Sequence, residues 1–329
     1  MVPAPEGPPD AVVAHFAPST TRLTWHRAPG GFSGAAVWRG DDSTGAPRVA
    51  VKGWPTNTPP ERVARAHLWL ARAAPLPFVP AVFAGVRGLT AVLADGRLWD
   101  ASKWMPGAPH PAPAAGHIRA ACEAVAQLHL TWPAEPAERP CRGVAGRLEA
   151  LLTHGPHFAG GRALPHIGPE LDSLLQRSAR AVARLAGPAV ATLRPWEARP
   201  VSARPCVRDL RAEHVLFHEG RVTGIVDYGA MGFDNPAADL ARLLGDWAGT
   251  DPELFGEGLR AYRRAGGPLD VPDEFVRLLA WTGTVCSVLG WLVRIVVRRE
   301  PVTRPAEVAI RLGEVLVRAE RVTHLAPIS

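Results

Sequence analysis

A proline- and glycine-rich segment at residues 105–115 divides the chain into two parts with different hydrophobic patterns. Before it, from about residue 20 to 100, short apolar runs alternate with Gly or Asp turns, a pattern typical of strands. After it, apolar residues recur at helical spacing over long stretches. This order indicates a small β part followed by a larger helical part. Gly and Pro follow no period, which argues against repeat architectures.

The predicted elements follow this division. In the first part we expect strands at 35–38, 49–51 and 90–93 and one helix at about 59–73, opened by a possible capping box at Thr58-Pro59-Pro60-Glu61. In the second part the expected helices span about 116–130, 143–153, 169–186, 236–248, 253–265, 273–298 and 305–322. Two strand-like runs within 213–228, separated by a turn at Gly220, interrupt the helices.

Composition limits the class of protein. The chain has 329 residues, of which 47% are hydrophobic and 21% charged, so it can bury a sizeable core and is not globally disordered. The formal charge of +6 is a mild excess, and the basic residues are scattered, so nucleic-acid binding is not indicated. An apolar run at 278–293 is too short for a membrane span and fits a buried core helix.

The cysteines and the N-terminus indicate a cytoplasmic protein. The four cysteines are far apart and form no C-x-x-C motif, which argues against a zinc ribbon or a disulfide framework and suits a reducing compartment. The first residues show neither a basic region nor an apolar stretch of a signal peptide.

Two carboxylates stand at the edges of a predicted hairpin between residues 207 and 229. Asp209 lies in the loop before the first strand, and Asp227 ends the second strand-like run. A loop–strand–turn–strand unit can bring both toward one point, where one could orient a hydroxyl and the other hold a divalent cation. The hairpin could instead be structural, with both aspartates as turn residues.

The motifs around this hairpin resemble those of the kinase-like superfamily, and most closely the aminoglycoside phosphotransferase family of small-molecule kinases. Residues 208–214, Arg-Asp-Leu-Arg-Ala-Glu-His, are similar to the kinase catalytic loop, and Asp227-Tyr228-Gly229 is similar to the D-F-G motif. Residues 234–242 are similar to the stretch that follows it in this family. Upstream, Val49-Ala50-Val51-Lys52 resembles V-A-I-K, and residues 30–34 resemble a nucleotide-binding Gly-rich hairpin.

The resemblance covers about residues 20–250 and implies an α+β, protein-kinase-like two-lobed fold, with a small antiparallel β N-lobe carrying one helix and a larger, mainly helical C-lobe. The expected parts are a flexible N-terminal tail at 1–19, a nucleotide-binding N-lobe at 20–102, a hinge at 103–108 and, at 109–329, a C-lobe with the catalytic loop and the acceptor site.

The resemblance also implies ATP-dependent phosphoryl transfer to a small-molecule hydroxyl, with Mg²⁺ as cofactor. Asp209 would accept the hydroxyl proton, and Arg211 would neutralise the transferred group. Asp227 would bind Mg²⁺, with His214 as the second residue of the metal site. The expected ATP-binding residues are Gly30, Gly31, Ser33, Gly34 and Lys52, together with Trp104 and Met105 of the connector, whose backbone would receive the adenine.

Three positions depart from the family's pattern. The first His of the catalytic loop is Val207, and the Asn five residues after Asp209 is His214, whose imidazole matches Mg²⁺ less well than an oxygen. His214 could hydrogen-bond a phosphate instead. The helix at 59–73 offers Glu61 as its one acidic residue, which could pair with Lys52 or serve the capping box. These departures motivate an alternative, a catalytically silent nucleotide-binding or scaffold protein on the same fold.

Three further residues have expected structural roles. Asp239 should accept backbone N–H bonds and steady the catalytic loop, and Asn235 should cap the helix that begins after Pro236. His129, at the end of a helix, is expected to pack.

The acceptor itself is not specified by any motif. Residues 132–205 hold 10 Arg and 6 Asp or Glu, which leans away from a cationic aminoglycoside. A nucleic-acid or membrane partner is not expected, although an Arg-rich nucleic-acid binder remains a third hypothesis, and the oligomeric state is left open.

Overall fold

The structure is a computed structural model that describes residues 6–17, 19–28, 31–32, 34–135, 137–161 and 163–322. The chain divides into two compact units. The N-terminal unit comprises residues 1–110 and 213–230, and the helical unit comprises 111–212 and 231–329. The expected boundary placed 213–230 in the C-lobe. The structure differs because strand β10 (Val215–His218) pairs with β6 (Ala108–Pro109) of the connector.

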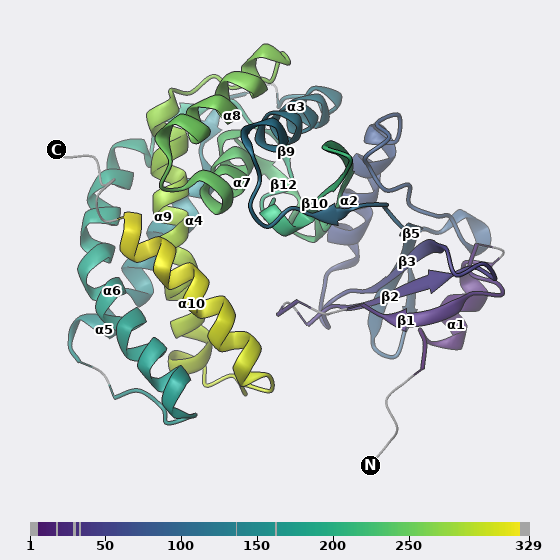
Figure 1. The fold of residues 1–329 in the computed structure, drawn as a ribbon, viewed down its shortest axis with the longest axis horizontal. Helices are drawn as coiled ribbons and strands as arrows, with labels where there is room; N and C mark the ends of the chain where they lie inside the picture. The colour runs from purple at the N-terminus through teal and green to yellow at the C-terminus, as the bar shows by residue number, and fades with distance from the viewer. Residues whose placement is uncertain are drawn as a thin grey trace. The chain divides into compact units, whose positions relative to one another are not determined.

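Within the described residues, five antiparallel strands form the main sheet of the N-terminal unit, in the order β1-β2-β3-β5-β4 (Figure 1). Their bounds are β1 Thr24–Arg27, β2 Ala36–Asp41, β3 Pro47–Gly53, β4 Val92–Ala94 and β5 Arg97–Lys103. Lys52 on β3 is the register partner of Asp100 on β5, so both side chains lie on one face of the sheet. Val51 and its partner Ala101 lie on the other face.

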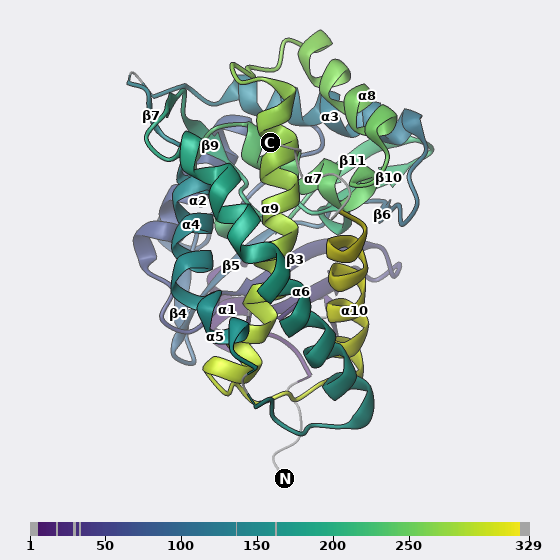
Figure 2. The same ribbon diagram turned by 90° about the vertical axis from the view of Figure 1, so that its left-hand side faces the viewer.

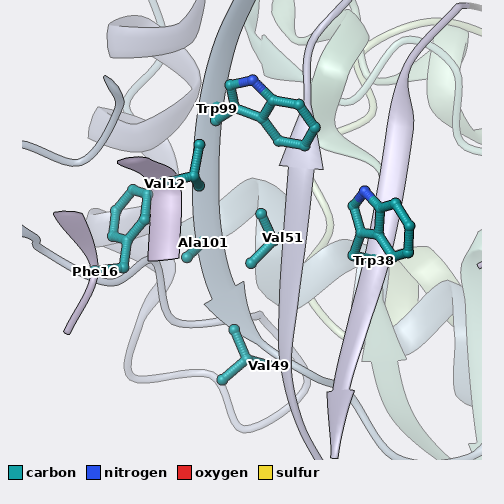
Figure 3. Packing of buried hydrophobic residues seen from close by; sticks show 7 residues of the cluster. All are labelled: Val12, Phe16, Trp38, Val49, Val51, Trp99 and Ala101. Carbon is teal, nitrogen blue, oxygen red and sulfur yellow. The ribbon is translucent and has the colours of Figure 1, made fainter. Parts of the chain in front are cut away.

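The face that carries Val51 is covered by α1 (Asp10–His15) (Figure 3). Val12 and Phe16 are fully buried there against Trp38 and Trp99 of the sheet. Burial of such side chains contributes about 1.5–3 kcal/mol each. The expectation of a flexible tail was therefore wrong for this helix, because α1 places Val12 and Phe16 in the core.

The helix α2 spans Pro60–Ala73, close to the expected range. Its expected capping box is not formed: no side chain caps the helix, and the Thr58 hydroxyl donates to the carbonyl of Pro55. Strands β10 and β11 (Arg221–Ile225) form the expected hairpin. Glu219 and Gly220 both have positive φ, as a two-residue turn of type I′ requires.

The helical unit consists of long helices with short strand pairs. The helices are α3 Ala115–Thr131, α4 Arg142–His154, α5 Pro156–Ala159, α6 Pro169–Leu193, α7 Ala237–Ala248, α8 Pro252–Arg264, α9 Asp273–Leu292 and α10 Pro305–Val322. The strands are β7 Arg139–Pro140 with β8 Pro200–Val201, and β9 Arg204–Cys206 with β12 Gly232–Asp234. A short 3₁₀ turn lies in this unit at Arg194–Trp196, another at the boundary at Ala212–His214, and two lie in the N-terminal unit at Val86–Gly88 and Tyr228–Ala230.

The helix α9 packs against α4, α6, α7 and α10 (Figure 2). With the π-helical turn Val293–Val297 that extends it, α9 is long and apolar enough to cross a membrane, but half of its most apolar window is buried inside the protein. The helix α6 exceeds its expected end at 186, because it continues through Pro188 and buries Ala189 and Leu193.

Candidate active site

Lys52 and Asp227 form an ion pair within the N-terminal unit. The Nζ of Lys52, on β3, lies 2.7 Å from Oδ1 of Asp227, which follows β11. Asp227 has a φ of 61°, an uncommon conformation for a residue with a side chain, so the surrounding turn must hold it. The structure therefore brings together two residues that are far apart in the sequence and that the V-A-I-K and D-F-G resemblances had singled out.

The electrostatics of the pair keep Asp227 ionised. Burial by itself would raise the pKa of this carboxyl, but the Lys52 ammonium, His214 and the N–H of Gly229 lower the pKa from 3.8 to about 2. Its side chain is nevertheless 48% exposed. A carboxylate that is charged at neutral pH and open to solvent suits a hard cation.

The hairpin brings His214 to Asp227. His214 directly precedes β10, Asp227 follows β11, and the register pairs Val215 with Ile225. The N–H of Val226 donates to the carbonyl of His214, which closes this end of the hairpin. As a result, Nε2 of His214 lies 3.8 Å from Oδ2 of Asp227.

The Gly-rich hairpin is described only in part. Gly30 and Ser33 lie outside the described residues. Gly34 has a φ of +79°, which favours glycine, and a Cβ there would meet nothing within 4 Å. Its carbonyl accepts a hydrogen bond from Nη1 of Arg97 at 3.3 Å. Gly31 and Gly34 lie between β1 and β2, as the resemblance implies.

The connector runs directly on from β5. The N–H of Trp104 donates to the carbonyl of Arg48, and Met105 is buried. The side chain of Met105 is therefore largely inaccessible, and the N–H of Trp104 already has a backbone acceptor. Gly107 has a φ of +97°, and a Cβ there would lie 2.6 Å from the carbonyl oxygen of Phe217, so only glycine fits.

Asp209 lies in the helical unit, in the loop after β9. Nε of Arg242, on α7, donates to Oδ1 of Asp209 at 3.2 Å. Asp246, one turn further along α7, accepts a hydrogen bond from the N–H of Ala212. The expected residue Arg211 lies between these anchored points and is partly buried. The helix α7 thus holds the loop that carries Asp209 and Arg211.

Asp239 is the anchor of this loop. Its carboxylate accepts the backbone N–H groups of Val207 and Arg208 at 2.7 and 2.6 Å, which confirms the expected role. It also lies 3.0 Å from Nε2 of His129, whose Nδ1 lies 2.8 Å from the hydroxyl of Tyr262. The bonds to Val207 and His129 and the contact with Tyr262 are buried, and the bond to Arg208 is partly buried, so together they strongly restrict the loop.

His129 is buried, as expected of a packing residue, but the sequence did not predict that both of its ring nitrogens are in hydrogen-bonding contact. A histidine on the apolar stripe of a helix was the available signal, because burial requires polar partners. Val207, in contrast, is simply buried, and its backbone carries the interaction with Asp239.

His129, Cys206 and Asp239 could geometrically hold a metal ion, since their ligand atoms lie within 4.8 Å of one another. The chemistry argues for a structural cluster instead. Both oxygens of Asp239 already accept hydrogen bonds. Burial raises the pKa of the Cys206 thiol well above its usual range, which disfavours the thiolate that binds metals.

The fold and these residues define a protein-kinase-like phosphotransferase architecture. Comparison with known families matches residues 24–275 to the Phosphotransferase enzyme family, and the chain belongs to this family. No curated protein matches the chain.

Solved structures with the same fold include several antibiotic phosphotransferases. A spectinomycin phosphotransferase in complex with ADP and spectinomycin has a TM-score of 0.65 and 12% identity, covering 90% of this chain and 92% of that one. An aminoglycoside phosphotransferase from Alicyclobacillus acidocaldarius has a TM-score of 0.58 and 16% identity, covering 99% and 95%. The macrolide 2′-phosphotransferase from Brachybacterium faecium has a TM-score of 0.52 and 19% identity, covering 88% and 91%.

Proposed function

We propose that the chain is an active ATP-dependent phosphotransferase that transfers the γ-phosphate to a hydroxyl of a small molecule. The observation that carries this proposal is the 2.7 Å pair between Lys52 and Asp227, with His214 beside it. A strained, solvent-open carboxylate paired with one of the chain's two lysines is typical of a functional site. Membership of the family supports the reaction class.

The residues of the N-terminal unit would bind the nucleotide. Lys52 and the backbone of Gly30, Gly31, Ser33 and Gly34 would contact the phosphates, and the backbone of Trp104 and Met105 would receive the adenine. Asp227 suits Mg²⁺ because it offers a charged oxygen that is open to solvent. The nitrogen of His214 fits Mg²⁺ less well, and we place it at the edge of the same metal site. Bound Mg²⁺ would neutralise charge on the phosphates.

The residues of the catalytic loop would act on the acceptor. Asp209 would orient the acceptor hydroxyl and take its proton, while the guanidinium of Arg242 fixes the direction of the carboxylate. Arg211 would neutralise charge on the transferred phosphoryl group. The four cysteines are free thiols, which fits action in the cytoplasm, where ATP is available.

The test is ATP consumption across a panel of antibiotics, sugars, amino alcohols and other hydroxyl compounds. Asp209→Asn should lower turnover by about 10²–10⁴ while nucleotide affinity stays the same, because the amide keeps the shape but cannot take a proton. Asp227→Ala should remove Mg²⁺-dependent nucleotide binding. Stabilisation by ATP and Mg²⁺ without turnover on any acceptor would favour the silent nucleotide-binding protein instead.

A further inference from the structure

The helix α2 contacts residues that surround Lys52 and residues that surround Asp227, and it does so through side chains other than a carboxylate. Its sequence contains one acidic residue, Glu61, which is exposed in the first turn. Lys52 is paired with Asp227 instead. Other residues of α2 connect the helix to Lys52 and Asp227.

Arg62 is the first of these residues. Its Nε and Nη2 both donate to the carbonyl oxygen of Gly229, at 2.9 and 2.6 Å. Gly229 lies two residues after Asp227, and its N–H points toward Oδ1 of Asp227 at 3.4 Å. Two charged donors on one acceptor form a stronger and better directed contact than a neutral hydrogen bond. Arg62 therefore holds the turn in which Asp227 adopts its strained conformation.

His67 is the second residue. It is buried, with Nδ1 at 2.8 Å from the Thr90 hydroxyl and Nε2 at 3.0 Å from Oδ2 of Asp100. The same oxygen of Asp100 accepts the indole N–H of Trp54 at 2.6 Å. The ring of Trp54 in turn lies 4.8 Å from Nζ of Lys52, a cation–π distance.

The network around His67 includes a buried carboxylate, whose removal from water is unfavourable in free energy. Asp100 is buried, and a buried carboxylate is unfavourable unless hydrogen bonds compensate it. It lies beside Lys52 in the sheet register, yet Lys52 reaches Asp227. His67 and Trp54 compensate the charge of Asp100, which leaves the Lys52 ammonium to Asp227.

We propose that α2 positions the nucleotide-binding pair through Arg62, which fixes the turn of Asp227, and through His67, which fixes Trp54 against Lys52 by way of Asp100. The two residues replace the helix carboxylate that pairs with the strand lysine in kinase-like enzymes. Arg62 and His67 are positioning residues in this proposal, which rests on the proposed function for its catalytic consequence but not for its local geometry.

The first experiment compares Arg62→Met, Arg62→Lys and the control Arg65→Met, an exposed arginine on the same helix. Amide hydrogen exchange of the nucleotide-free protein should become faster in residues 227–231 for Arg62→Met, less so for Arg62→Lys, and not for Arg65→Met. Calorimetric affinity for ADP with Mg²⁺ should fall about 10-fold for Arg62→Met and be partly restored in Arg62→Lys. Melting temperatures monitor the fold. If Arg62→Met matches Arg65→Met in both measurements, the assignment of Arg62 is overturned.

The second experiment compares His67→Gln with His67→Leu, which have similar volumes. The glutamine amide can still donate to Asp100, so ADP affinity should be largely kept in His67→Gln and reduced several-fold in His67→Leu. Equal affinities in two folded variants would overturn the assignment of His67. If the proposed function is wrong but Arg62 does position the turn, the result differs. The wild type then shows no phosphotransfer, while Arg62→Met still speeds amide exchange in residues 227–231.

Discussion

The imidazole of His214 is the feature of the site that departs most from what Mg²⁺ prefers. Its Nε2 lies 3.8 Å from Asp227, so any cation held by Asp227 is close to a nitrogen rather than to an amide oxygen. We predict that His214→Asn lowers the Mg²⁺ concentration needed for half-maximal nucleotide binding, because the new oxygen is the better ligand. Calorimetry at several Mg²⁺ concentrations measures this.

The control for this prediction is His218→Asn, an exposed histidine at the end of β10, the strand that follows His214. It should leave the Mg²⁺ requirement unchanged. A weaker Mg²⁺ response in His214→Asn, with normal binding in the control, would show that His214 serves the phosphates and not the metal.

Single residues also show where sequence reasoning stops. Lys52 and Asp227, which the structure pairs, could be singled out because each stands in a short motif and lysine is rare in this chain. Arg62 could not, because it is one of many arginines and its partner is a backbone carbonyl far away in the sequence. Every residue has a backbone carbonyl, so the sequence does not show which one a side chain will contact. Glu61 was considered because of its residue type, and the structure leaves it exposed.

At the scale of elements, the buried cluster around Asp239 anchors three parts of the helical unit: the loop that carries Asp209, α3 and α8. We predict that Asp239→Ala lowers the free energy of unfolding by about 3–5 kcal/mol, because it leaves buried donors without an acceptor. Denaturant unfolding measures this loss.

A matched comparison is Asp251→Ala, which removes the side-chain cap of α8. A lost cap typically costs about 1 kcal/mol. If the two variants lost similar amounts, the cluster around Asp239 would be no more than an ordinary helix cap.

The start of α7 provides a test that depends on pH. The side-chain oxygen of Asn235 accepts the N–H of Ala237, although the N-cap position of α7 is taken by Pro236, and the amide nitrogen of Asn235 donates to Asp270. Burial tends to raise the pKa of Asp270, but hydrogen bonds from Asn235 and Ser202 lower it below 3.8. The depressed pKa means that the charged form stabilises the fold above pH 3.8 and that this contribution is lost as the pH falls below it.

We therefore predict that Asp270→Asn is less stable than the wild type at pH 6 and that the difference shrinks as the pH falls below 3.8. Urea unfolding at several pH values measures it. A difference that is constant over this range would assign the effect to shape and not to charge.

At the scale of the whole molecule, the division into a sheet-containing unit and a helical unit followed from hydrophobic periodicity. The expected helices agree with α2–α4 and α6–α10 within a few residues, apart from the continuation of α6 through Pro188. The assignment of 213–230 to the N-terminal unit did not follow, because it depends on the pairing of β10 with β6, a contact between distant segments. The helix α1 was missed because six residues in a proline-rich context carry little periodic signal.

The charge of the whole chain bears on the class of acceptor. The net charge is +6. Three carboxylates between residues 209 and 246 each lie within 4 Å of an arginine. These pairs are Asp209 with Arg242, Asp234 with Arg208, and Asp246 with Arg318. Carboxylates that are already paired attract an ammonium group less strongly than unpaired ones. We therefore expect a neutral or anionic hydroxyl compound to be a better acceptor than a polycation.

We predict that neutral or anionic acceptors have a kcat/KM at least about 10-fold above that of a polycationic aminoglycoside, a difference of about 1.4 kcal/mol in transition-state stabilisation. The variant Arg318→Gln releases Asp246 from one partner, so it should lower KM for cationic acceptors, whereas Arg311→Gln on the same helix should not. Steady-state kinetics at low and at physiological ionic strength measure both effects, since charge attraction weakens as salt rises. The prediction would be contradicted if an aminoglycoside were the best acceptor and if Arg318→Gln and Arg311→Gln had the same KM for cationic acceptors. Groups other than these carboxylates would then select the acceptor.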